Sequence, residues 1–171
     1  KMSDMDPLMT LANSLMVAIE NEDQPKLNRI YLEGYNQGKL KDLVNSSVRG
    51  YDATPLIWAI QCKVDINIIH QLINAGADVN DGDGSTAIKT PLGELLSNII
   101  PRSSTGKPRD IQYTAEVVVL LLDNGVDVTQ KSDPGWQTPL QLANTFLPED
   151  DVGRVGKFSK QGIIDMIKER I

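Results

Sequence analysis

The stretch TPLIWAIQ, residues 54–61, opens with a Thr-Pro-Leu triplet that returns in TPLGELLS at residues 90–97 and in TPLQLANT at residues 138–145. In such a triplet the threonine side chain can accept a backbone N–H as an N-cap. The proline fits the first helical turn, where its missing N–H costs no hydrogen bond. Each triplet is therefore expected to begin a helix.

A second motif recurs where the same units end. LINAGADVN at residues 72–80 and LLDNGVDVT at residues 121–129 share a leucine and a Gly-x-Asp-Val group. Ile68, Ile69 and Leu72 lie on one face of a predicted helix, and Gly76 stands where a left-handed glycine would end it. The unit is predicted as helix, turn, helix and turn. Such a unit cannot bury its apolar face alone and must stack on its neighbours.

This pattern resembles the ankyrin repeat. TPLIWA and GADVN correspond to the T-P-L-H-x-A opening and the G-A-D-V-N close of that family. The resemblance covers nearly the whole chain and implies an all-α fold, an ankyrin-type helix-turn-helix solenoid of about four repeats. One domain, residues 1–171, is expected, with repeats at about residues 11–45, 50–80, 89–129 and 133–171.

The uneven spacing of the triplets predicts insertions inside the repeats. Ala59 and Gly76 are 17 residues apart, whereas the matching Leu95 and Gly125 are 30 residues apart. Loop insertions are therefore expected inside repeats 3 and 4, at residues 99–112 and 146–159, which are rich in turn-forming residues. A smaller extension at residues 34–43 is expected to lengthen the turn after the first repeat.

The histidine that the family places after Thr-Pro-Leu is absent from all three triplets. Ile57, Gly93 and Gln141 stand there instead. The resemblance implies that this change removes a hydrogen bond between neighbouring turns, which predicts a less stable stack than a consensus one.

Composition bounds the class of protein. The net charge of −6 argues against a nucleic-acid binder, which usually carries a basic face. The longest apolar run, Val117–Leu122, is too short to cross a bilayer, so no membrane partner is expected. Cys62 is the only cysteine, which excludes a disulfide within the chain and favours a reducing compartment. A cytoplasmic monomer is the resulting expectation.

No catalytic, metal or cofactor site is predicted. His70 is the only histidine, and one histidine with one cysteine cannot form a structural zinc site. A Cys62–His70 nucleophile pair would need the two groups in hydrogen-bond reach and a third residue to orient the base, and the sequence indicates no such residue. The chain is therefore not expected to be an enzyme.

The resemblance implies a non-catalytic protein–protein interaction module whose protein partner binds the concave face, formed by turn tips and first helices. Tyr51, Trp136 and Phe146 are the expected anchors because aromatic residues dominate interface energetics. Trp58 is expected in the core. Trp136, in a polar turn, either packs on an adjacent turn or is presented to a partner. The full candidate set is Tyr51, Ala53, Gln61, Cys62, Ala87, Lys89, Ser97, Asn98, Trp136, Gln137, Thr145 and Phe146.

One alternative stays open. The chain can be the interaction domain of a larger enzyme or effector whose activity lies outside these residues. A stand-alone enzyme would need a pocket with titratable groups of strongly shifted pKa.

Overall fold

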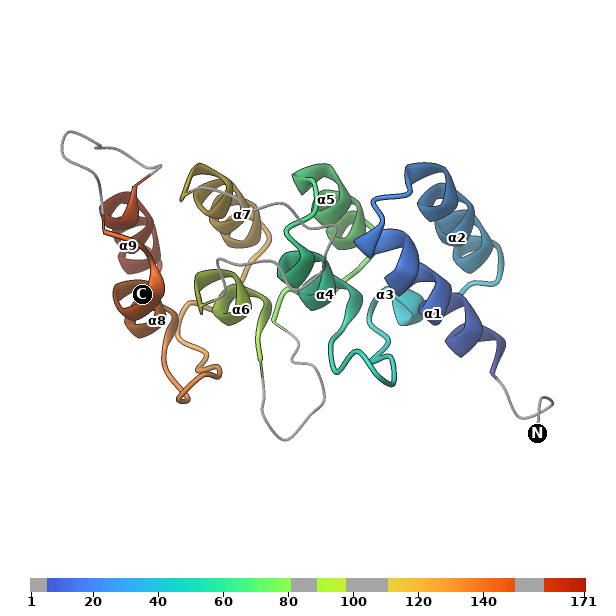
Figure 1. Cartoon of the computed structure of the whole chain (residues 1–171), viewed down its shortest axis with the longest axis horizontal. Coiled ribbons are helices and arrows are strands. Elements are labelled where there is room, and N and C mark those ends of the chain that lie inside the picture. The colour runs from blue at the N-terminus through green and yellow to red at the C-terminus, as the bar shows by residue number, and fades with distance from the viewer. Residues whose placement is uncertain (1–5, 81–88, 98–110, 150–158) are drawn as a thin grey trace.

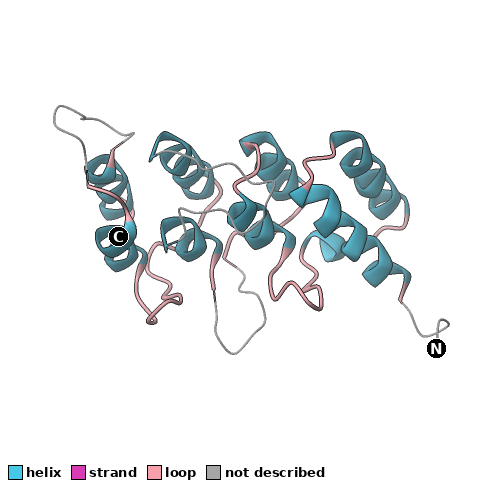
Figure 2. Cartoon of the chain, viewed as in Figure 1, coloured by secondary structure: helices cyan, strands magenta, loops and turns pink. Residues whose placement is uncertain are grey.

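The computed structural model describes residues 6–80, 89–97, 111–149 and 159–171. Most of the two predicted loop insertions falls outside these residues. Within them the regular elements are all helices, joined by loops (Figure 2), and a single isolated antiparallel bridge joins Ser132 to Gln137. The predicted all-α class is confirmed for this part of the chain. The helices are α1 Pro7–Glu20, α2 Gln24–Asn36, α3 Leu40–Val44, α4 Pro55–Cys62, α5 Ile66–Asn74, α6 Pro91–Ser97, α7 Ile111–Asp123, α8 Pro139–Phe146 and α9 Lys160–Lys168.

The helices form two parallel rows (Figure 1). Helices α1, α4, α6 and α8 lie side by side in the first row, and α2, α5, α7 and α9 lie in the second. Each first-row helix packs on the second-row helix that follows it, and it also packs on its neighbours within the row. The loops at residues 45–54 and 129–138 project from the first row, on the side away from the second. These two loops are called the turn tips below.

The Thr-Pro-Leu triplets begin helices, as predicted. The hydroxyl oxygens of Thr54 and Thr138 accept the backbone N–H of the residue three positions on, and each proline occupies the first helical turn. Thr90 does the same for the N–H of Gly93 at 3.0 Å. Gly76 and Gly125, the predicted helix stops, have φ values of +110° and +83°, the left-handed region where glycine costs least.

The first pair of helices departs from the prediction. Helix α1 begins at Pro7, capped by Asp6, so the structured unit starts before residue 11. Helix α2 continues through Gly34, which is buried, and the left-handed glycine that follows the helix is Gly38. Helix α3 occupies much of the segment predicted as a lengthened turn. Gly34 has no side chain, so Leu43 of α3 can pack closely against α2.

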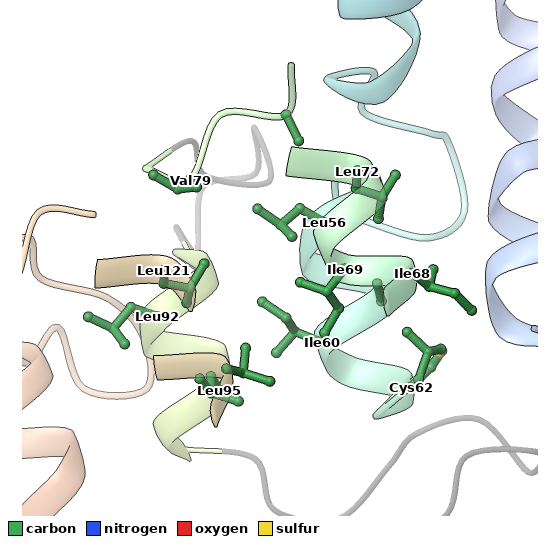
Figure 3. Close-up of a cluster of buried hydrophobic side chains, with 14 of the residues drawn as sticks. Leu56, Ile60, Cys62, Ile68, Ile69, Leu72, Val79, Leu92, Leu95 and Leu121 are labelled. Carbon is green, nitrogen blue, oxygen red and sulfur yellow. The ribbon is translucent and has the colours of Figure 1, made fainter. Parts of the chain in front are cut away.

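The core is aliphatic and continuous along the stack (Figure 3). Leu56 and Ile60 of α4 face Ile69 and Leu72 of α5, and the neighbouring layer contributes Leu92. Burial of each large aliphatic side chain contributes about 1.5–3 kcal/mol. Because these side chains come from consecutive layers, each layer depends on its neighbour for burial.

Two asparagines repeat one hydrogen-bond pattern between layers. Asn45 donates from Nδ2 to the Gly76 carbonyl at 2.9 Å and accepts the Asp78 N–H at 2.8 Å. Asn80 donates from Nδ2 to the Gly125 carbonyl at 3.3 Å and accepts the Asp127 N–H at 2.6 Å. Each asparagine therefore ties the end of its own unit to the Gly-x-Asp turn of the next.

In two layers, other residues form hydrogen bonds near the position where the family has a histidine after Thr-Pro-Leu. Gln141 accepts the Thr138 N–H at 2.9 Å and so completes a capping box at the start of α8. Gly93 leaves room for the buried Ser132 side chain of the following turn, whose Oγ accepts the Thr90 N–H at 3.0 Å. A hydrogen bond between neighbouring turns is thus present, supplied by a serine that the sequence pattern did not single out.

Candidate functional site

The turn tip at residues 129–138 displays an aromatic ring. Ser132 and Gln137 exchange two backbone hydrogen bonds of 2.9 Å, and Gln137 Nε2 donates to the Pro134 carbonyl at 3.1 Å. These bonds close the turn around Trp136, which is 51% exposed and has a φ of +53°. A bulky residue seldom adopts a positive φ, so this conformation carries strain. About half of the Trp136 surface is open to solvent.

Tyr51, at the other described turn tip, is packed rather than displayed. Its ring meets the Trp58 ring edge-on, with centroids 5.0 Å apart and an interplanar angle of 76°. Trp58 Nε1 donates to the Met16 carbonyl at 3.2 Å, which joins α4 to α1. Burial raises the pKa of the Tyr51 phenol, and the nearby Glu20 carboxylate raises it further by its charge and its hydrogen bond. Tyr51 and the half-buried Trp58 therefore link two layers.

Three candidate contact residues are buried, which corrects the predicted surface. Ala53 and Cys62 are 0% exposed and Gln61 is 2% exposed, so they have almost no surface to offer to a partner. The reason is the position of α4 between α1, α5 and α6. Every residue of α4 except Trp58 is buried. The signal was in the sequence, because PLIWAIQC is apolar nearly all round, and a helix of that kind is enclosed on all sides.

The remaining candidates divide by exposure. Lys89 and Ser97 are partly exposed, and Ser97 Oγ donates to the Gly93 carbonyl of its own helix at 2.7 Å. Thr145 is exposed, whereas Phe146 is half-buried and packs against the core. Ala87 and Asn98 lie outside the described residues.

Helix α8 presents an uncharged polar face that the candidate set only partly covered. Gln141, Asn144 and Thr145 are exposed, and their i, i+3, i+4 spacing places them together on one side of the helix. Gln137 precedes them at the base of the turn that carries Trp136. Gln141 and Asn144 were missed, although the same spacing in the sequence could have identified them. The face and the indole lie in the same layer.

Two buried charged residues, Lys63 and Glu94, influence each other electrostatically. Lys63 is 1% exposed and Glu94 is 3% exposed. Lys63 follows α4 with a left-handed φ of +56°. Burial lowers the pKa of the Lys63 ammonium to about 8, and the Glu94 carboxylate opposes that shift. Two charges out of water need each other, because removal of one leaves the other uncompensated.

The two potentially reactive side chains, His70 and Cys62, lie in different environments. His70 is exposed on α5, with Nδ1 3.1 Å from Asn74 Nδ2, whereas Cys62 is buried at the end of α4. No group of three or more His, Cys, Asp or Glu side chains among the described residues could hold a metal ion. In that same part of the chain, no helix has the length and apolar character to cross a membrane.

Comparison with known proteins identifies the repeat. Residues 51–84 match the family model of the ankyrin repeat, a span that contains both α4 and α5 and agrees with the repeat expected at residues 50–80. A search of individual curated proteins found no match. The predicted resemblance to the ankyrin repeat is therefore confirmed over this segment, residues 51–84.

Proposed function

We propose that the chain is a non-catalytic module that binds a protein partner on the surface of its turn tips and first-row helices. Ankyrin repeats generally mediate protein–protein interaction, and the match at residues 51–84 supports that general role here. The two described turn tips project on one side of the first row (Figure 1), so a partner could contact several layers at once.

We further propose a single domain of about four repeats. The packing of α1 on α2, α4 on α5, α6 on α7 and α8 on α9 supports this count. The first repeat would then begin near Pro7 rather than near residue 11. The single cysteine also supports a reducing compartment, and we propose a monomer. Light scattering after size-exclusion chromatography tests the monomer directly.

Trp136 is the observation that carries the proposed binding surface. Trp136 is 51% exposed in a strained turn that three hydrogen bonds close, so a large part of its surface is open to a partner. Aromatic residues on rigid supports are typical interface anchors. Around it, the exposed α8 residues Gln141, Asn144 and Thr145 supply hydrogen bonds without charge.

A site-specific cross-link tests this surface. A photoreactive benzoylphenylalanine in place of Trp136 should, on irradiation in the native cell extract, join the chain to one protein that mass spectrometry identifies. The same amino acid in place of Leu32, exposed on α2 in the second row, is the matched control. Equal labelling from both positions, or labelling from position 32 alone, would contradict the proposed surface.

A further inference from the structure

Side chains of α2 and α5 line a shallow hollow. These two helices belong to the second row, on the side away from the turn tips (Figure 1). Its lining consists of uncharged polar side chains from both helices. Helix α5, INIIHQLIN, contains no charged residue at all. The lining residues are Gln24, Asn28, Asn67, His70 and Gln71.

The two glutamines of the hollow form a reciprocal amide pair. Gln24 Nε2 donates to Gln71 Oε1 at 2.9 Å, and Gln71 Nε2 donates back to Gln24 Oε1 at 3.2 Å. Gln24 Nε2 also donates to Asn28 Oδ1 at 2.8 Å. These bonds fix the orientation of three side chains before any ligand arrives, which lowers the entropy cost of binding.

Other polar groups of the hollow remain available. Asn28 Nδ2 and the side-chain amide of Asn67 have no hydrogen-bond partner among the residues that the structure describes. Asn74 Nδ2 lies 3.1 Å from His70 Nδ1, and the amide nitrogen can donate to this ring nitrogen in the tautomer that is protonated on Nε2. The hollow thus offers amide donors and acceptors together with the imidazole ring of His70.

We propose that this hollow binds main-chain amide groups of an extended, uncharged peptide segment of a protein partner. A primary amide combines a donor and an acceptor, as a peptide group does, and Asn28 Nδ2 and the Asn67 side-chain amide lie available beside the fixed Gln24–Gln71 pair. A charged ligand would lose hydration without a counter-charge in the lining. This surface lies apart from the turn tips, so the inference goes beyond the proposed function.

The face of α2 that carries Gln24 and Asn28, called the α2 stripe below, also carries an exposed aromatic ring. Gln24, Asn28, Tyr31 and Tyr35 follow at helical spacing, and Tyr35 is 71% exposed. Tyr35 is seven residues beyond Asn28, about 10 Å along the helix. An extended peptide covers that distance in about three residues. The bound segment should therefore carry an apolar side chain about three positions from the residues that occupy the hollow.

A peptide array followed by NMR titration tests the inference. The array holds acetylated and amidated heptapeptides, half of them uncharged and half with two Lys or two Asp residues. We expect uncharged peptides with an apolar residue to bind. Titration of the ¹⁵N-labelled chain with such a peptide should shift the Asn28 and Asn67 side-chain amides and the His70 ring saturably. Asn28→Leu and Asn67→Leu should each weaken binding up to about tenfold, the effect of one lost hydrogen bond.

The matched control is Asn36→Leu, the same change at an exposed position of α2 outside the α2 stripe, which should leave binding unchanged. Four outcomes would overturn the inference: no binding at millimolar peptide, a preference for charged peptides, binding without shifts at the three reporter residues, or shifts with a neutral malto-oligosaccharide but not with peptide. Trp136→Ala should not affect this titration, so failure here leaves the proposed function standing.

Discussion

At the scale of single residues, Lys63 shows how far sequence reasoning reaches. Lysine side chains are rarely buried unless they are paired. The structure instead buries Lys63 against the third layer, near Glu94, because α4 is enclosed by α1, α5 and α6. No local pattern encodes that burial, since the residues that cover the side chain come from other layers.

The stability of the fold should depend on pH through Lys63. Its pKa is about 8 in the folded chain and 10.5 unperturbed, so between these values the unfolded chain binds the extra proton. Unfolding free energy should therefore rise with pH from about pH 7.5, by about 1–3 kcal/mol up to pH 9.5. Above that range Tyr31 lowers the unfolding free energy as the pH rises. Burial raises the pKa of its phenol in the folded chain, so the phenol ionises more readily in the unfolded chain.

Urea unfolding at several pH values, with Lys63→Met as the reference, measures this term. The difference between the two proteins should vary over pH 7.5–9.5, since the other titrating groups are shared. A constant difference would mean that Lys63 has the same pKa in both states.

At the scale of secondary-structure elements, the helix starts could be predicted and the contacts between turns could not. Threonine caps and prolines act on their own helices, so the triplets carry that information locally. The contact of Gly93 with Ser132 depends on two residues in different layers. The extent of α2 and the presence of α3 were likewise missed, because residues 34–43 were expected to form a lengthened turn, whereas Leu43 packs against Gly34.

Gly93→Ala should destabilise the stack because the added Cβ would overlap the Ser132 side chain. We expect a loss of about 1–3 kcal/mol, typical of overpacking in a buried site. Ser132→Gly should also destabilise, since it removes the acceptor of the Thr90 N–H. The double variant should lose less than the sum of the two, as chemical denaturation can measure. Strict additivity would show that the two positions do not contact each other.

At the scale of the whole molecule, the repeat signature predicted helices that stack in layers, and residues 51–84 confirm it by their family match. The binding surface was less predictable. Ala53, Gln61 and Cys62 were predicted as contact residues from their positions in the repeat. That prediction did not account for how completely the neighbouring helices cover α4. Trp136 and the polar face of α8 remain exposed, and they define the proposed surface.

The most direct test of the proposed surface compares affinity and stability in Trp136→Gly. Glycine tolerates a φ of +53°, so thermal stability should stay equal or rise by up to about 1 kcal/mol. Affinity for the partner found by cross-linking, measured by calorimetry per folded molecule, should fall by about 2 kcal/mol or more. Leu32→Ala, an exposed apolar residue of the second row, should change neither quantity by much. If Trp136→Gly instead melts early and binds with unchanged affinity, Trp136 is a packing residue and the proposed surface is wrong.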